Sequence, residues 1–142
     1  MIAIGIDIGG TSIKAAAVDS TGKVYEKYTM PLYVDDGQDK IIEDLIRLTK
    51  EYIEKQNFKE DICGIGLGIP GSIDSVNGVV TYANNLKWSE LHVVEKFKEH
   101  FSCPIRITND ANAAALGEAK FGAGKKYKDM VMITLGTGVG SG

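Results

Sequence analysis

The chain has 142 residues, a formal net charge of −3 and 44% hydrophobic residues, which is enough for one domain with its own core. Because the sequence has no basic stretch, and lysines alternate with glutamates where charges gather, we expect no nucleic-acid partner. Apolar runs are too short to span a membrane, and Met1 leads into an expected strand without a signal-peptide pattern, so the sequence predicts a cytoplasmic protein. Cys63 and Cys103 lack metal-site spacing and are expected to be free structural thiols.

The first predicted element is a hairpin within residues 1–19. Isoleucine occupies every second position of the first run, at Ile2, Ile4, Ile6 and Ile8, which is the period of a strand with one buried face. Gly9 and Gly10 predict a two-residue turn with positive φ values, after which Ile13 to Val18 returns antiparallel. Lys14 is expected to be solvated. Residues 23–30 predict a third antiparallel strand.

A long amphipathic helix is predicted from Gln38. Its apolar face consists of Ile41, Ile42, Leu45, Ile46, Leu48, Tyr52 and Ile53. Residues 61–69 form a nearly continuous apolar run, which predicts a strand buried between two layers. Pro70 and Gly71 end this strand.

The middle of the chain, residues 72–88, is expected to be loop with a possible small hairpin around Asn77 and Gly78. Ser89 is predicted to cap a second helix, whose apolar face is Leu91, Val94, Phe97 and Phe101. Trp88 could stack on a ligand, but packing in the core is the favoured interpretation.

The last predicted elements of the first domain are a strand at residues 105–108 and a helix capped by Asn109 or Asp110. Gly122 and Gly124 end that helix. The order β-β-β-α-β-α-β-α indicates an α/β fold around a mixed five-stranded sheet.

Two parts of unequal size are predicted: a domain at residues 1–122, and a hinge with the beginning of a second domain at 123–142. The second part contains an apolar strand at residues 129–135 and a glycine-rich turn at 136–142, with no room for a return strand. A strand without partners should pair or exchange with a neighbouring copy, so a homo-oligomer is expected.

The turn at Gly9 and Gly10 has a predicted chemical use. Without side chains, it lets an anion approach the backbone N–H groups, as in other phosphate cradles. Asp7, which ends the preceding strand, offers a hard oxygen ligand for Mg²⁺. From these residues alone, an ordinary hairpin with a charged rim is an equal alternative.

Three spaced motifs carry a resemblance to a known family. DIGGTSIKAAAVD at the start, NDANAAALGEA in the middle and LGTGVGSG at the end resemble the ROK family of sugar kinases and repressors, within the actin-like ATPase (ribonuclease H-like) superfamily. The resemblance implies that ATP phosphates are held from both sides of a cleft. The residues implied are Asp7, Gly9, Gly10 and Thr11 on one side and Gly136, Thr137 and Gly138 on the other.

The sugar contacts are implied by the same resemblance. The segment ending in Gly71 resembles the family's G-x-P-G turn, and residues 84–88 resemble its N-L-x-W segment, which favours Asn85 over Asn84 as a ligand. Asp110 is implied to be the catalytic base, and Asn109 can donate to and accept from sugar hydroxyls. Phosphoryl transfer to a hydroxyl needs such a positioned proton acceptor. The alternative is that one or both of these residues only cap the helix.

The resulting hypothesis is an ATP- and Mg²⁺-dependent hexose kinase, with glucose as the expected substrate and glucose 6-phosphate as product. Fructose, mannose or an N-acetylhexosamine are alternative substrates. A sugar-sensing repressor is the second hypothesis, weakened because Met1 begins the first strand directly, and a non-catalytic sugar-binding domain is the third. The family's adenine segments, E-x-G-H motif and zinc site would lie beyond Gly142, so we expect no zinc here and an inactive or poor enzyme.

Overall fold

The computed structural model describes residues 1–58, 62–135 and 139–142. Its centre is a mixed five-stranded sheet in the order β3-β2-β1-β4-β8, which confirms the predicted α/β class. The first three strands are antiparallel neighbours: β1 (Ile2–Ile8), β2 (Ser12–Asp19) and β3 (Val24–Pro31). On the other side of β1 come β4 (Ile62–Ile69) and then β8 (Ile105–Asn109), both parallel to it.

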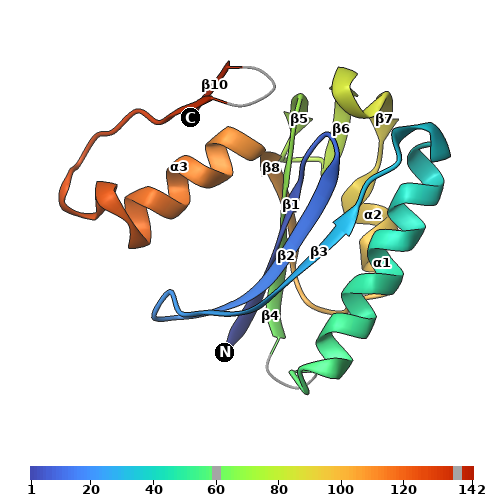
Figure 1. The fold of residues 1–142 in the computed structure, drawn as a ribbon, viewed down its shortest axis with the longest axis horizontal. Coiled ribbons are helices and arrows are strands. Elements are labelled where there is room, and N and C mark those ends of the chain that lie inside the picture. Colours follow the sequence, from blue (N-terminus) through green and yellow to red (C-terminus); the bar gives the residue numbers. More distant parts are fainter. Residues whose placement is uncertain (59–61, 136–138) are drawn as a thin grey trace.

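The two faces of this sheet are chemically different. Alternate residues of β1, from Ile2 to Ile8, are buried against α1 (Gln38–Lys55) and α2 (Val93–Lys98). The other face carries small residues such as Gly5 and Gly66, and α3 (Asp110–Phe121) lies on that side (Figure 1). Asp7 belongs to the face with the small residues because it alternates with Ile6 and Ile8.

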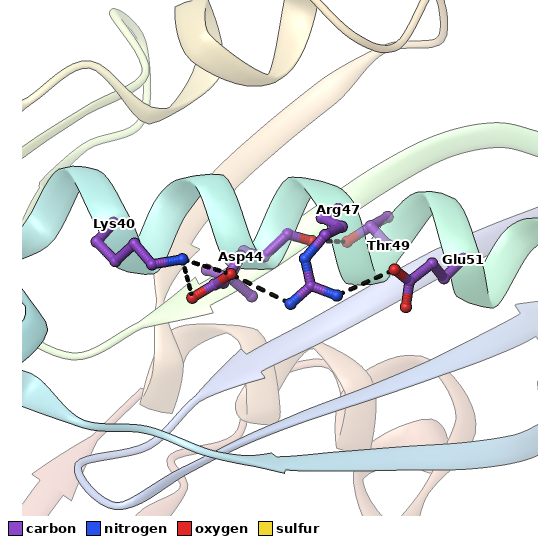
Figure 2. A network of polar contacts seen from close by, with 6 residues as sticks. Lys40, Asp44, Arg47, Thr49 and Glu51 are labelled. Atoms are coloured by element: carbon purple, nitrogen blue, oxygen red, sulfur yellow. Dashed lines mark hydrogen bonds and ion pairs between the residues drawn. The ribbon is translucent and has the colours of Figure 1, made fainter.

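The helix α1 buries the apolar stripe that its sequence predicts, except that Thr49 is buried where Leu48 was expected. The Thr49 hydroxyl donates to the Leu45 carbonyl at 2.7 Å, so its burial leaves no donor unpaired. Its exposed side carries ion pairs that Figure 2 shows in a row. Asp44 accepts from both Lys40 (2.9 Å) and Arg47 (3.2 Å), and Arg47 also pairs with Glu51 at 3.0 Å.

A second sheet replaces most of the expected loop. It contains β5 (Ser72–Asp74), β6 (Val79–Ala83) and β7 (Trp88–Leu91) in antiparallel order, so the possible hairpin is confirmed and a third strand is added. The predicted helix cap at Ser89 is wrong, because Ser89 lies within β7 and α2 begins only at Val93. Trp88 is fully buried in the core, which confirms its packing role.

Short 3₁₀ turns complete the connections. They lie at η1 (Val34–Asp36), η2 (Asn84–Leu86) and η3 (Ala123–Lys126). Among the described residues, no helix has the length and apolar character to cross a membrane. Lys14 is exposed as expected, and both Cys63 and Cys103 are free thiols.

The C-terminal segment differs from its prediction in two ways. The expected strand at residues 129–135 is reduced to β9 (Ile133–Leu135). A return strand, β10 (Val139–Ser141), pairs antiparallel with it, so the expectation that the chain ends before such a strand is wrong. Met132 and Gly142 extend the pairing by exchanging two backbone hydrogen bonds of 2.9 and 3.0 Å.

Candidate active site

A cleft of about 930 Å³ opens at the carboxyl ends of the parallel strands β1, β4 and β8. This edge of an open α/β sheet is where such folds bind their ligands, and the volume suits a small molecule. Seven of the residues expected to bind substrate or phosphate line it: Gly9, Gly10, Thr11, Gly71, Asn85, Asn109 and Asp110. The hairpin of β9 and β10 lines it as well, through Thr134, Leu135, Val139, Gly140 and Ser141.

The glycine turn between β1 and β2 presents bare backbone to the cleft. Its geometry differs from the prediction: the strands are joined through Gly9, Gly10 and Thr11, and neither glycine has a positive φ. The Gly9 N–H donates to the Ser12 carbonyl at 2.9 Å, and a Cβ on Gly9 would lie only 2.9 Å from that oxygen. A Cβ on Gly10 would have no neighbour within 4 Å. The fold therefore restricts Gly9 by crowding, whereas Gly10 borders open space.

Asn109 and Asp110 lie at the junction of β8 and α3. Asn109 is the N-cap of α3: its Oδ1 accepts from the N–H groups of Ala111 at 3.0 Å and Asn112 at 3.3 Å. The Asp110 carboxylate begins the helix and accepts from the Ala111 N–H at 2.9 Å. The capping alternative is thus confirmed for Asn109, and both residues also border the cleft. A strand-to-helix junction holds their side chains in a fixed direction.

The Gly71 turn connects β4 to β5 beside this junction. Gly71 has φ +108°, a value that other residues rarely adopt, and a Cβ there would overlap the carbonyl oxygen of Tyr82. Asn85 reaches the cleft from the 3₁₀ turn that follows β6. Asn84, the alternative ligand, instead accepts a hydrogen bond from the Tyr82 hydroxyl at 3.1 Å.

Asp7 lies outside this cleft. It borders an adjacent groove of about 970 Å³ on the face with the small residues, together with Lys14 and Asp110, and Asp110 borders both spaces. Partial burial raises the pKa of Asp7 above 3.8, the Lys14 ammonium opposes this, and the Asp110 charge adds to it. The Asp110 charge therefore lies close enough to act on the Asp7 carboxyl.

The fit of these carboxylates to Mg²⁺ depends on how that ion is bound. Within the described ranges, no group of three or more His, Cys, Asp or Glu side chains is placed to hold a metal. Mg²⁺ is commonly held by one or two carboxylates together with waters and substrate phosphates. Asp7, with Asp110 near it, can supply the one or two carboxylate ligands that this requires. The predicted residues Gly136, Thr137 and Gly138 lie outside the described residues.

Several polar residues of the cleft were missed by the sequence reasoning. They are Ser72, Ser75, Thr108, Asn112, Thr134 and Ser141. Thr108 could have been found, since it precedes the carboxyl end of a predicted parallel strand. Ser72 and Ser75 could not, because the expected hairpin around Asn77 and Gly78 does not show which space its residues border.

The fold and the cleft define an α/β domain of the actin-like ATPase class, with a glycine turn and a strand-to-helix aspartate facing one space. Residues 3–142 match the sequence profile of the ROK family, and the chain belongs to that family.

Three relatives illustrate the similarity. A glucokinase of Halalkalibacterium halodurans is 40% identical over 98% of this chain and 42% of its own length. A xylose repressor of Caldicellulosiruptor bescii is 38% identical over 98% of this chain and 35% of its own length. The crystal structure of a ROK family glucokinase from Streptomyces griseus, in complex with glucose and AMPPNP, superimposes with a TM-score of 0.87 at 33% identity, covering 99% of this chain and 43% of that one. This chain therefore spans less than half the length of these relatives.

Proposed function

We propose that this chain is the sugar-binding and base-bearing part of an ATP-dependent hexose kinase that converts glucose to glucose 6-phosphate. The observation that carries the proposal is the shared cleft, where Asp110 and the bare turn at Gly10 border one space of about 930 Å³. Transfer of a phosphoryl group needs a proton acceptor and a phosphate cradle on either side of the acceptor hydroxyl. The similarity to glucokinases over almost the whole chain supports glucose as the sugar.

Each side chain has a proposed role. Asp110 accepts the proton of the sugar hydroxyl as that oxygen attacks the γ-phosphorus, and the bond from this phosphorus to the β-phosphate oxygen breaks, so that ADP leaves. Asn85 holds the other hydroxyls with an amide that can both donate and accept, together with the remaining amide hydrogen of Asn109 and the backbone at Gly71. The backbone N–H groups of Gly10 and Thr11 face the phosphates beside Gly9, whose own N–H is bonded to the Ser12 carbonyl. Gly136, Thr137 and Gly138 are proposed on the opposite side. Asp7 would hold Mg²⁺, which supplies neutralisation of phosphate charge when bound.

The proposed activity belongs to a longer protein. Residues 1–122 are proposed as one domain, and residues 123–142 as a hinge with the first hairpin of a second domain. Because less than half of a relative's length is present, we expect the 142-residue chain alone to turn over poorly or not at all. ATP and unphosphorylated sugar are both available in the cytoplasm, which is the proposed location.

The test is a sugar-dependent assay of ADP release by the full-length protein, with glucose, fructose, mannose and N-acetylhexosamines compared at equal concentration. Glucose should give the highest kcat/KM. No ADP release with any of these sugars would reject the kinase proposal. The position of the new phosphate, read by ³¹P NMR, tests the assignment of the 6-hydroxyl.

A sugar-sensing repressor is the second candidate because a xylose repressor is 38% identical over 98% of this chain. Such a protein would bind sugar without ADP release. Calorimetric titration of xylose and glucose, run beside the ADP assay, distinguishes the two candidates. Binding of glucose with turnover supports the kinase, whereas binding of xylose without turnover supports the repressor.

A further inference from the structure

The side-chain amide of Asn109 makes hydrogen bonds in two directions. Its Oδ1 caps α3 by accepting from two backbone N–H groups at 3.0 and 3.3 Å. Its Nδ2 donates to the carbonyl oxygen of Gly71 at 3.2 Å. One side chain therefore joins the helix that begins with Asp110 to the turn that follows the neighbouring strand.

The turn that contains Gly71 packs against the end of β6. A Cβ on Gly71 would overlap the Tyr82 carbonyl oxygen and would lie 2.8 Å from the Ala83 Cα. Ala83 is buried and directly precedes the 3₁₀ turn that carries Asn85. Because closely packed atoms cannot shift independently, a displacement of Gly71 would move the Asn85 turn as well.

We infer that Asn109 is a positioning residue that holds the Gly71 turn, and through it the Asn85 turn, in place relative to the Asp110 carboxylate. An amide nitrogen has two hydrogens, so the bond to Gly71 leaves one for a hydroxyl in the cleft. The hydrogen bond from Asn109 to Gly71, here called the tether, is a contact within the chain, and only its catalytic consequence rests on the proposed function. Small displacements of a bound hydroxyl from its base are costly, so such a tether would matter for turnover.

Variants at position 109 separate the cap from the tether. Asn109→Asp keeps an oxygen that accepts from the first N–H groups of α3 but places a second oxygen against the Gly71 carbonyl. Asn109→Ser keeps a cap and is too short to reach Gly71. Asn112→Asp is the matched control because it adds the same charge to the first turn of α3 without changing the Gly71 bond.

The measurement is hydrogen–deuterium exchange of the 142-residue chain, read by mass spectrometry on peptides covering residues 70–75 and 82–86. Loss of one hydrogen bond predicts exchange about five- to tenfold faster in both segments for Asn109→Asp and Asn109→Ser. Asn112→Asp should leave both segments unchanged. If Asn109→Asp does not fold, the serine variant answers the same question.

Unchanged exchange in residues 70–75 would overturn the inference. A uniform acceleration over α3 and both segments would also overturn it, because that is the result of a lost cap alone. This readout needs no turnover, so the tether can stand where the kinase proposal fails. In an active full-length protein, Asn109→Ser should also lower kcat/KM for the sugar by about ten- to a hundredfold.

Discussion

Asp7 on β1 and Lys14 on β2 are direct partners across the first hairpin, and the Asp7 carboxyl nevertheless has a raised pKa. Partial burial on the face with the small residues outweighs the attraction of the Lys14 ammonium, and the Asp110 charge acts in the same direction as burial. A lysine opposite Asp7 in the strand register therefore does not make Asp7 a stronger acid. Its protonation is linked to two neighbours that can each be removed.

Removing the Lys14 charge and removing the Asp110 charge should shift the pKa of Asp7 in opposite directions. Lys14→Met should raise the pKa of Asp7 further, because it removes the opposing charge. Asp110→Asn should lower the pKa, because it removes a negative charge. The measurement is the pH dependence of the Asp7 carboxyl ¹³C shift, with Asp36→Asn as a control for a general change of charge. Shifts in the same direction for both variants would contradict this account.

The free energy of unfolding should depend on pH because the pKa of Asp7 is raised in the folded state. Because the folded pKa of Asp7 lies above its ordinary value of 3.8, the folded state binds more protons between those two values. The free energy of unfolding therefore falls as pH rises through that window. Asp7→Asn has no carboxyl group to deprotonate, so its free energy of unfolding should be at least that of the wild type at pH 7. The difference in free energy between the two proteins should vanish below pH 3.8. Urea unfolding at several pH values measures it. If Asp7→Asn is less stable than the wild type at pH 7, the attraction between the Asp7 carboxylate and Lys14 outweighs the cost of burying that carboxylate.

Asp110 should be required for turnover but not for folding. A general base contributes about 10²- to 10⁴-fold to the rate, so Asp110→Asn should lower kcat in the full-length protein by that factor. Its hydrogen bond from the Ala111 N–H is one that an asparagine oxygen can also accept, so the melting temperature should change little. A variant that keeps wild-type kcat would remove Asp110 from the proposed mechanism.

Much of the main sheet and its first helix could be predicted because these elements have one buried face and one exposed face. Along the whole of β1, buried isoleucines alternate with exposed residues, and α1 buries an unbroken stripe. These periods are present in the sequence itself. The sequence also indicated the β8–α3 junction, since Asn109 is a strong capping residue and caps as expected.

The strand β7 was misread as the start of a helix for a specific reason. Leu91 lies three residues before Val94, which is the spacing of a helix face, and the prediction counted it with Val94, Phe97 and Phe101. In the structure Leu91 instead ends β7, and Glu90 before it has φ +47°, a backbone reversal that is uncommon in residues other than glycine. No sequence period encodes such a reversal.

The space that Asp7 borders was a second feature that could not be predicted from the sequence. Strand alternation places it on the sheet face opposite the isoleucines, but the sequence does not say which space that face borders. In the structure it borders the groove beside Lys14 instead of the cleft with Gly10. Its role as a Mg²⁺ ligand therefore remains a proposal that depends on its closeness to Asp110.

The two glycines of the first turn should respond differently to a methyl group. Gly10→Ala meets no atom within 4 Å, so the fold should tolerate it, whereas Gly9→Ala brings its Cβ to 2.9 Å from the Ser12 oxygen. If the turn binds phosphate, Gly10→Ala should raise KM for ATP about tenfold with an unchanged melting temperature, because its methyl group occupies the space of the ligand. Gly9→Ala should lower the melting temperature. An unchanged KM for ATP in a folded Gly10→Ala would argue against a phosphate cradle here.

Gly71 should be intolerant of any side chain. Gly71→Ala combines φ +108° with an overlap against the Tyr82 oxygen, and each strained backbone position costs about 1–3 kcal/mol. Gly66→Ala is the matched control because it lies in β4 and its Cβ meets nothing within 4 Å. Urea unfolding should show a lower midpoint for Gly71→Ala alone. Equal midpoints for the two variants would show that the β5–β6 sheet shifts without cost.

The β9–β10 hairpin should make the 142-residue chain self-associate. Ile133 is 66% exposed and Leu135 is 81% exposed, in a two-stranded sheet whose strands each leave one edge unpaired among the described residues. Unpaired edges with exposed apolar side chains favour pairing between copies, either edge to edge or by strand exchange. Sedimentation velocity should therefore show a species larger than the 15.3 kDa monomer that grows with concentration. Ile133→Lys should reduce it, whereas Val76→Lys, at a 92% exposed position in the β5–β6 turn, should not. A monomer at all concentrations would show that this hairpin covers its own apolar surface in solution.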